Sequence, residues 1–268
     1  MVKEKEINHT DQMVAGARPD AREFVVDASR GEHSATGSAR TERDAQNWIG
    51  LDRDSSRARI RLIITSYDSI IVRTYCRIRF VILNLRFLEE LDQYIPRHGA
   101  VVDFGCGFGL FSLYFASTAR GRRITGVDLN EARVKAAQLS AKRLSLSNAS
   151  YTAGNATDYL VPNGLNCVYM LDLLHHIPQE SVAPLLQRIY DALLPDGILL
   201  IKDVDTVPAY KRLFTLALDR VMVGLEPIHY WPSRELISLL ESLGFEVYSH
   251  EMRDILPYAH RLYICRKR

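Results

Sequence analysis

The sequence predicts an α/β protein with a doubly wound, mostly parallel sheet and a helical N-terminal extension. From residue 100 onward, short apolar runs of strand length alternate with stretches of helical periodicity. The first apolar run ends in Asp103 and enters a loop with glycines at 105, 107 and 109, as expected where a strand turns into a helix beside a ligand. A chain of 268 residues with 47% hydrophobic residues can bury the core of one large domain.

The composition excludes several other classes of protein. With 34 Lys and Arg against 32 Asp and Glu, a net charge of +2 gives no general attraction for nucleic acid or an anionic membrane. The widely spaced cysteines argue against a disulfide framework and a zinc ribbon; they are Cys76, Cys106, Cys167 and Cys265. The sequence contains no membrane-spanning apolar run and no signal-peptide core. We therefore expect a cytoplasmic protein, with peripheral membrane contact as an open alternative.

The N-terminal third divides into two segments. Residues 1–54 are rich in small, polar and charged side chains, which predicts a mobile or loosely docked extension, either a variable tail or a flap over a ligand. Residues 55–97 form a basic amphipathic segment, with one long helix or two that end near Pro96. Its arginines predict either a solvated helix face or a basic surface for an acidic carrier protein or anionic membrane; they include Arg57, Arg59, Arg61, Arg73, Arg77 and Arg79.

Residues 98–268 contain the predicted sheet and its covering helices. Strands are expected at 100–104, 123–127, 149–153, 166–171, 198–203, 245–250 and 260–266. Helices are expected at 109–119, 130–145, 179–193, 208–222 and 233–243. Ligands of such sheets bind beyond the carboxyl ends of the strands, so the loops after the first four strands are the expected site.

Three acids follow the first three strands. The glycine loop lacks the G-x-G-x-x-G spacing because position 110 is Leu, and it lacks the Gly-Lys-Ser/Thr of a phosphate-binding loop. Asp103 before the loop disfavours a pyrophosphate and suits a cationic amine. Asp128 at the tip of the second strand can accept hydrogen bonds from ribose hydroxyls, and Asp158 after the third can accept one from an adenine amine. Together these groups describe S-adenosylmethionine.

Residues 100–202 resemble the class I S-adenosylmethionine-dependent methyltransferases. The family's acid and glycine motif matches 103–109, its ribose-binding acid matches Asp128, and its adenine-contacting acid matches Asp158. Its fourth-strand motif matches 170–177, and its Leu-Pro-Asp-Gly turn matches 194–197. The resemblance implies a Rossmann-like seven-stranded sheet with an antiparallel last strand, and S-adenosylhomocysteine as the product. The presence of two histidines after the fourth strand resembles the branch of the family that acts on small molecules, quinones or lipids.

The motifs define the candidate donor-binding residues and bases. The donor-binding set is Asp103, Gly105, Cys106, Gly107, Gly109, Asp128, Leu129, Ala156, Thr157, Asp158, Leu171 and Asp172. His175, and less clearly His176, is a candidate general base, with local packing as the alternative. Neither a Pro-Pro-Tyr/Phe motif nor a Pro-Cys nucleophile is present, so nucleic-acid bases are disfavoured as acceptors. No metal-ligand pattern is evident, so we expect a metal-independent enzyme.

An insertion at about 204–232 is a candidate lid over the acceptor site. Its aromatic side chains suit the wall of an apolar pocket; they are Tyr210, His229, Tyr230 and Trp231, with helix packing as the alternative. We expect methyl transfer to an oxygen or carbon of an apolar small molecule or lipid-like acceptor. The competing hypotheses are a non-catalytic module that keeps the fold and an RNA-modifying methyltransferase. The sequence leaves open the acceptor's identity, the atom attacked and the oligomeric state.

Overall fold

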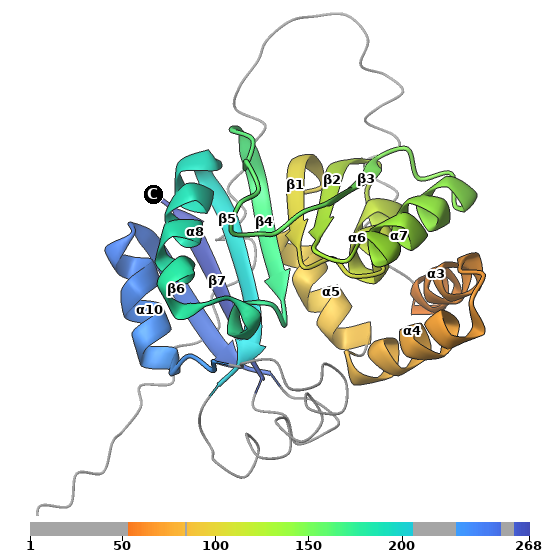
Figure 1. Ribbon diagram of the computed structural model, residues 1–268, viewed down its shortest axis with the longest axis horizontal. Helices are drawn as coiled ribbons and strands as arrows, with labels where there is room; N and C mark the ends of the chain where they lie inside the picture. The colour runs from red at the N-terminus through yellow and green to blue at the C-terminus, as the bar shows by residue number, and fades with distance from the viewer. Residues whose placement is uncertain (1–52, 84, 206–228, 253–259) are drawn as a thin grey trace, which may run out of the picture.

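A seven-stranded sheet forms the centre of the molecule. The structure is a computed structural model that describes residues 53–83, 85–205, 229–252 and 260–268. The strand order is β3-β2-β1-β4-β5-β7-β6 (Figure 1), and β7 is antiparallel to both of its neighbours while the pairs from β3 to β5 are parallel. The strands are β1 (His98–Phe104), β2 (Gly121–Asp128), β3 (Ala149–Ala153), β4 (Leu165–Leu171), β5 (Leu193–Val204), β6 (Phe245–Glu251) and β7 (His260–Lys267). The predicted fold, with its antiparallel last strand, is confirmed.

Strand β5 begins earlier than predicted. The turn of residues 194–197 was expected to precede the strand, but Leu193 already pairs with Leu165 of β4. The next pair in the register joins Ile198 to Cys167, so four residues of β5 oppose one residue of β4 and bulge outward. Asp196 accommodates the bulge with φ of 61°.

Helices cover both faces of the sheet. They are α3 (Arg53–Ser66), α4 (Ile70–Ile82), α5 (Leu85–Tyr94), α6 (Leu110–Thr118), α7 (Glu131–Arg143), α8 (Gln179–Ala192) and α10 (Ser233–Ser242), with a short 3-10 helix η1 (Leu174–His176). Successive residues of a strand point to opposite faces of the sheet and pack against different helices. Cys167 and Tyr169 pack with α3–α7, whereas Val168 and Met170 pack with α8 and α10. The sheet is therefore buried on both sides, as expected for a doubly wound fold.

The basic segment forms three helices, and the prediction of one or two was wrong. Ser69 ends the break after α3, because its hydroxyl accepts a hydrogen bond from the Val72 amide of α4 at 3.4 Å. A second break follows Leu83, which caps α4 with φ of −94° and ψ of 82°. Periodicity alone runs through both breaks because each break keeps apolar residues facing the core.

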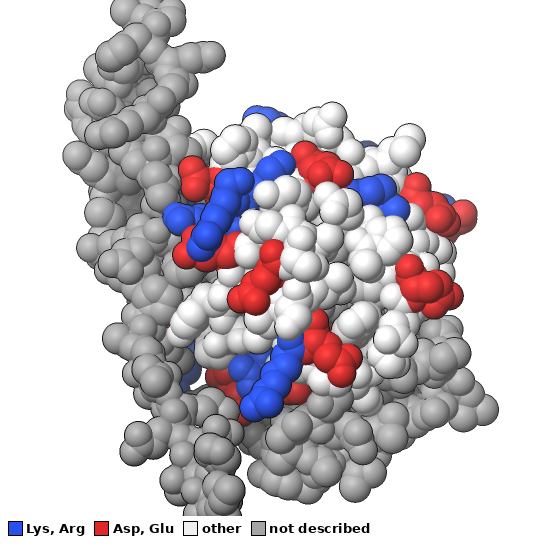
Figure 2. All heavy atoms as spheres, turned by 90° about the vertical axis from the view of Figure 1, so that its left-hand side faces the viewer, with Lys and Arg blue, Asp and Glu red and all other residues white. Residues whose placement is uncertain are grey.

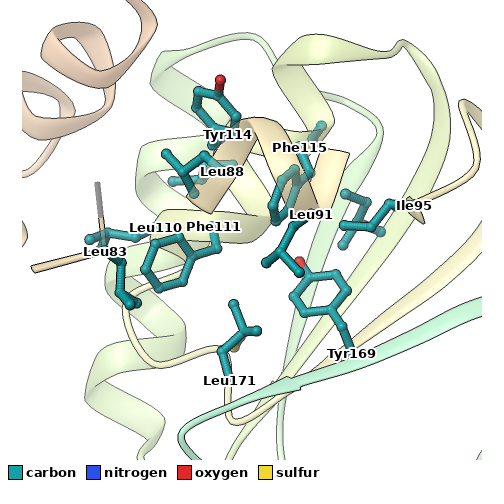
Figure 3. Close-up of a cluster of buried hydrophobic side chains, with 14 of the residues drawn as sticks. Leu83, Leu88, Leu91, Ile95, Leu110, Phe111, Tyr114, Phe115, Tyr169 and Leu171 are labelled. Carbon is teal, nitrogen blue, oxygen red and sulfur yellow. The ribbon is translucent and has the colours of Figure 1, made fainter. Parts of the chain in front are cut away.

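These N-terminal helices share the core of the sheet domain. Figure 3 shows Leu88 and Leu91 of α5 packed between α6 and strand β4, which contributes Tyr169. Both leucines are fully buried, as is Phe115 of α6. The packing places α4 beside the carboxyl ends of the strands, where the sequence predicts the site. Among the described residues, no helix combines the length and apolar character needed to cross a bilayer.

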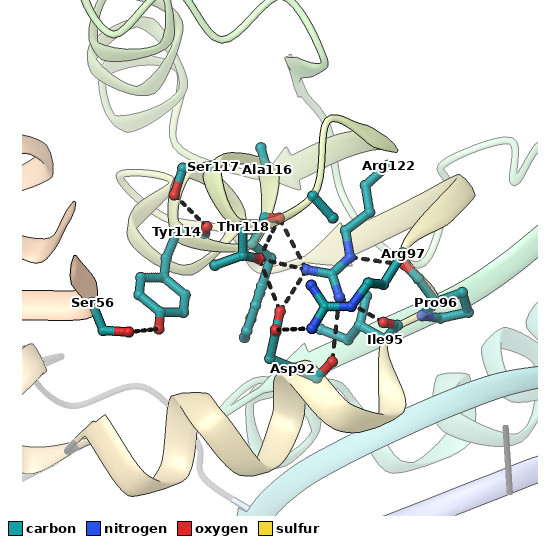
Figure 4. Close-up of polar contacts among 12 residues, drawn as sticks. Ser56, Asp92, Ile95, Pro96, Arg97, Tyr114, Ala116, Ser117, Thr118 and Arg122 are labelled. Carbon is teal, nitrogen blue, oxygen red and sulfur yellow. Dashed lines mark hydrogen bonds and ion pairs between the residues drawn. The ribbon is translucent and has the colours of Figure 1, made fainter. Parts of the chain in front are cut away.

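A buried ion pair fastens α5 to the sheet. The Arg122 guanidinium of β2 is fully buried and donates to Asp92 Oδ1 at 2.6 Å (Figure 4). Its remaining hydrogen bonds go to the Thr118 hydroxyl and to the carbonyls of Asp92, Ile95, Pro96 and Phe115. A buried charge is tolerated only when it is paired and fully hydrogen-bonded, and this arginine meets both conditions.

Candidate functional site

A cavity of about 690 Å³ lies at the carboxyl ends of the central strands. It is bounded by the loops after β1, β2, β3 and β4, by η1 and by one face of α4. The predicted site residues that it brings together are Asp103, Gly105, Cys106, Gly107, Asp128, Leu129, Ala156, Thr157, Leu171, Asp172, His175 and His176. Their convergence follows from the parallel sheet, whose strands all end at one edge.

The glycine loop leaves room for a ligand at Gly107. Gly107 has φ of 54°, and a Cβ added there would meet no atom within 4 Å, so a side chain would project into open space on the cavity side. The loop itself is held against β2, because the amides of Gly105 and Cys106 donate to the Val127 carbonyl at 2.8 and 3.1 Å. The backbone at Gly107 is therefore both accessible and fixed.

Gly109 has a packing role and does not line the cavity. It is the N-cap of α6, with φ of 75°. A Cβ at this position would lie 2.8 Å from the Ala137 Cβ and 2.8 Å from the Tyr151 Cε1. The donor-binding role predicted for Gly109 is therefore not supported by its position; the glycine lets α6 approach α7 and β3 closely.

The Asp128 carboxylate is fixed at the end of β2. Its Oδ2 accepts a hydrogen bond from the Gly107 amide at 2.8 Å, and its Oδ1 accepts one from the Asn130 amide at 2.9 Å. Each carboxylate oxygen can accept more than one hydrogen bond, so the group can also bind a pair of hydroxyls. Exposed Leu129 follows it on the cavity wall and offers an apolar surface to a flat ring.

The loop after β3 leaves Asp158 out of the cavity lining. The Asp158 amide donates to the Asn155 carbonyl at 3.0 Å, and this turn leaves the Asp158 side chain exposed beside Thr157. Asn155 lines the cavity instead, together with Ala156 and Thr157. The structure therefore does not bring the predicted adenine-contacting acid to the site. Asn155, whose amide can both donate and accept, was missed because several polar residues stand together in this loop.

Replacing Asp128 by Ala is expected to weaken binding of S-adenosylhomocysteine by about 5- to 150-fold, equivalent to ~1–3 kcal/mol for polar groups left unpaired. Asp158→Ala serves as the matched control, because its exposed carboxylate does not line the cavity. Isothermal titration calorimetry measures both affinities. A larger loss in Asp158→Ala than in Asp128→Ala would show that the two acids have been assigned in the wrong order.

Asp103 lies at the buried base of the cavity and is 3% exposed. Burial raises the pKa of its carboxyl to about 8. The negative charge of Asp128 also raises this pKa, whereas hydrogen bonds with the hydroxyls of Tyr169 and Ser112 lower it. A cationic amine would favour the ionised form and relieve this desolvation. The position therefore fits the predicted amine contact.

The affinity for S-adenosylhomocysteine is accordingly expected to rise between about pH 6 and about pH 8, because the Asp103 carboxyl becomes ionised over this range. Asp103→Asn should bind more weakly at the upper pH and should lose the rise. Calorimetric titrations at several pH values test both statements. An equal rise in Asp103→Asn would assign the pH dependence to another group.

A cluster of basic side chains surrounds Asp172 after β4. Lys202 Nζ lies 2.5 Å from Oδ1, Arg79 Nη2 lies 3.0 Å from Oδ2, and His260 Nε2 lies 3.9 Å from Oδ1. Burial raises the pKa of Asp172, but Lys202, Arg79 and His260 together hold it well below its usual range. Asp172 also has φ of 58°, an uncommon backbone conformation for a residue with a side chain. The carboxylate is thus ionised and held in place by its neighbours.

Arg79, Lys202 and His260 were not predicted as site residues. Lys202 offered a signal, because a lysine within an apolar strand needs a buried partner. Arg79 was grouped with the predicted basic surface, but it lies on the cavity wall at 20% side-chain exposure. Arg73 is half-buried, and its Nε donates to the Tyr67 carbonyl at 2.6 Å. The arginines of this segment therefore do not share one surface.

His175 forms a buried pair with Asp203 of β5. Its Nδ1 lies 2.5 Å from Asp203 Oδ1, and its backbone amide donates to Asp203 Oδ2 at 3.0 Å. A carboxylate on Nδ1 favours the tautomer with the proton on that nitrogen, so the lone pair is on Nε2. The His176 ring lies alongside, with its centroid 4.1 Å from that of His175. Asp203 was missed because its partner is 28 positions away in the sequence.

The predicted aromatic wall supports His175 from outside the cavity. The His229 amide donates to the His175 carbonyl at 2.9 Å, and the Tyr230 ring lies 5.6 Å from the His175 ring. Trp231 packs on the core beside α10 and meets His229 edge-on. None of these three lines the described cavity. Tyr210, the predicted helix at 208–222 and most of the predicted lid lie outside the described residues, as does almost all of the predicted N-terminal extension.

The fold and the site define a class of protein. An acid and glycine loop after β1, a fixed carboxylate after β2 and a cavity across the central strands fit a class I S-adenosylmethionine-binding fold. Residues 75–250 match the family described as "Methyltransferase domain", and the chain belongs to this family.

Several known proteins are similar in sequence to parts of this chain. A ubiquinone biosynthesis O-methyltransferase of Pseudomonas savastanoi pv. phaseolicola is 30% identical over 149 residues, which cover 54% of this chain and 61% of that protein. An (S)-coclaurine N-methyltransferase of Thalictrum flavum subsp. glaucum is 24% identical over 39% of this chain and 28% of its own length. The chain thus spans less than two thirds of each relative.

A solved structure shows the same fold over most of the chain. The magnesium protoporphyrin IX methyltransferase of Synechocystis PCC 6803, with bound S-adenosylhomocysteine, aligns with a TM-score of 0.57 at 16% identity. The alignment covers 85% of this chain and 100% of the chain of that structure. Membership of the methyltransferase family makes S-adenosylmethionine the cofactor of this chain, and the open backbone at Gly107 with the acids Asp103 and Asp128 fits it. Among the described residues no group of three metal-binding side chains occurs, and metal independence stays a prediction.

Proposed function

We propose that the protein catalyses methyl transfer from S-adenosylmethionine to an oxygen or carbon of an apolar small molecule or lipid-like acceptor. The observation that carries this proposal is the buried His175–Asp203 pair on the wall of the donor cavity. A general base is needed where the acceptor loses a proton, as a hydroxyl or an acidic carbon does. The likeness to ubiquinone biosynthesis O-methyltransferases supports an oxygen acceptor.

The apolar part of the cavity wall supports an apolar acceptor. It comes from α4, from the glycine loop and from the start of α6, and its members are Tyr75, Ile82, Phe108, Leu110 and Phe111. The Tyr75 and Phe108 rings meet edge-on with centroids 5.3 Å apart. An aromatic or alkyl group placed against this wall would be shielded from water. The polar groups opposite it would then set the orientation of the reacting atom.

The positions of the chain's own groups support a role for each in this proposal. Asp103, Asp128 and the Gly107 backbone bind the donor, and the fixed acids orient it. When bound, S-adenosylmethionine supplies a methyl group that its sulfonium activates for in-line displacement. His175 Nε2 accepts the proton that the acceptor loses, and Asp203 stabilises the imidazolium that results. Arg79, held by Asp172, places positive charge at the same wall and would stabilise an anionic acceptor oxygen.

Acceptor assays test this proposal. The full chain is incubated with radiolabelled S-adenosylmethionine and three probes: an alkylated catechol, its dimethyl ether and the matching aniline. Transfer to the catechol alone is the expected result. Transfer to the aniline would contradict the oxygen or carbon acceptor, and turnover lost on removing the alkyl tail would support an apolar one.

An RNA acceptor is the second hypothesis, and it rests on the arginines alone. Two of these side chains, Arg73 and Arg79, are engaged within the fold, and the exposed arginines stand among aliphatic residues. RNA binding that weakens steeply with salt would support this alternative. Transfer of label to the catechol but not to RNA would remove it.

A further inference from the structure

Helix α4 exposes an apolar face to solvent. Its exposed residues are Ile70, Ile71, Thr74, Arg77, Ile78 and Val81, which recur at steps of three and four and form one stripe. Ile70 is 75% exposed, Ile71 81% and Val81 65%. A surface helix normally turns its aliphatic residues to the core and its charged residues to water. The stripe on α4 has the reverse character and contains a single charge.

Helix α3 extends this surface. Its exposed residues between 57 and 65 are Arg57, Ala58, Arg61, Leu62 and Thr65. From Ser55 to Leu83 the only acid is Asp68, and its carboxylate pairs with Arg143 at 2.7 Å. We call the exposed residues of α3 and α4 the α3–α4 face; its charged members, Arg57, Arg61 and Arg77, are all positive.

Helix α10, another surface helix of the described residues, does not share this pattern. The exposed residues of α10 are Arg234, Glu235, Ser238, Glu241 and Ser242. Figure 2 shows acidic and basic side chains interspersed on the side of the molecule that carries α10. Figure 1 shows α3 and α4 at the opposite end of the sheet. The α3–α4 face is therefore a local feature and not a property of the whole surface.

The same helix forms a wall of the donor cavity. Tyr75, Arg79 and Ile82 of α4 line the cavity, whereas Cys76 and Phe80 are buried in the core. The exposed stripe occupies the remaining side. A partner bound to the α3–α4 face would thus be separated from the donor cavity only by helix α4.

We propose that the α3–α4 face docks onto an anionic lipid bilayer. The aliphatic side chains of α4 enter the boundary between headgroups and acyl chains, and Arg57, Arg61 and Arg77 bind the anionic headgroups. A second copy of the chain is a poorer occupant, because a symmetric contact would bring arginines against arginines. An acidic protein surface would pair the arginines but leave the four aliphatic side chains without an apolar partner. This surface is separate from the donor site, so the proposal does not depend on the acceptor.

Vesicle sedimentation tests the proposal with the full chain. The probes are sucrose-loaded vesicles of phosphatidylcholine, alone or mixed with phosphatidylglycerol. The wild type should bind the mixed vesicles more tightly, and the double variant Ile70→Asn/Ile71→Asn should bind them at least about tenfold more weakly, because burial of two exposed aliphatic side chains is lost. The control Leu139→Asn, on the exposed side of α7, should bind like the wild type.

The charges are tested by Arg61→Gln/Arg77→Gln. This variant should lose most of the preference for phosphatidylglycerol and most of the salt dependence of binding. All variants should bind S-adenosylhomocysteine as the wild type does, which shows that they fold and that the donor site is intact. This readout also separates failure of the docking proposal from failure of the proposed function.

Four results would overturn the proposal. The first is no binding of the wild type to either vesicle. The second is an equal loss of vesicle binding in Leu139→Asn. The third is a change in particle mass by light scattering in Ile70→Asn/Ile71→Asn without a change in vesicle binding, which would assign the face to a second copy. Tighter binding to polyglutamate than to vesicles, unaffected by the isoleucine changes, would assign it to an acidic protein.

Discussion

Replacing His175 by Ala is expected to lower kcat by about 10²- to 10⁴-fold, the usual range for loss of a general base. The affinity for S-adenosylhomocysteine should change far less, because the donor-binding acids remain in place. Single-turnover measurements with the alkylated catechol isolate the chemical step. This is the largest effect on activity that the structure leads us to expect.

The physical reason is the geometry of the His175–Asp203 pair. Burial of both side chains, at 3% and 7% exposure, removes competing water from their 2.5 Å contact. Asp203 is a positioning residue, since it contacts the histidine and does not line the cavity. Asp203→Asn removes the charge that stabilises the imidazolium, so kcat should fall and the pH at which activity rises should shift.

His176 provides the matched control. It lies beside His175 on the same wall, but the buried Asp203 carboxylate contacts His175 Nδ1. His176→Ala should therefore retain most of the activity and the wild-type pH profile. A loss in His176→Ala as large as that expected for His175→Ala, with His175→Ala remaining active, would assign the base to His176.

Replacing Asp92 by Ala is expected to lower the free energy of unfolding by about 3–5 kcal/mol, because the Arg122 charge would remain buried without its partner. The guanidinium is fully buried, and Asp92 is 4% exposed, so water cannot replace the lost carboxylate without opening the contact between α5 and β2. Urea unfolding followed by circular dichroism measures the change.

A double replacement separates charge from packing. Asp92→Leu/Arg122→Met removes both charges and keeps apolar volume, so it should recover much of the stability lost in Asp92→Ala. Asp68→Ala is the surface control: it breaks the exposed pair with Arg143 and should leave the unfolding curve unchanged. Equal effects of Asp92→Ala and Asp68→Ala would show that burial does not set the strength of these pairs.

The alternation of strands and helices was sufficient to predict the sheet, but not every element boundary. The sequence did not predict the breaks that divide residues 55–94 into three helices, or the bulge of β5 opposite β4. The helix breaks keep apolar residues facing the core, so periodicity does not reveal them. In the same way, Gly109 reads as part of the ligand loop in the sequence, whereas its neighbours Ala137 and Tyr151 show a packing role.

The sequence by itself determined the fold class and the donor loop of this protein. An apolar strand that ends in Asp103 and enters the glycine loop has conformational requirements that are local, and parallel strands bring Asp103 and Asp128 to one edge. Only the tertiary structure decided that Asp203 holds His175, that Arg79 lines the cavity and that Asp158 does not. The direction of a side chain depends on partners that are distant in the sequence, and spacing along the chain does not specify them.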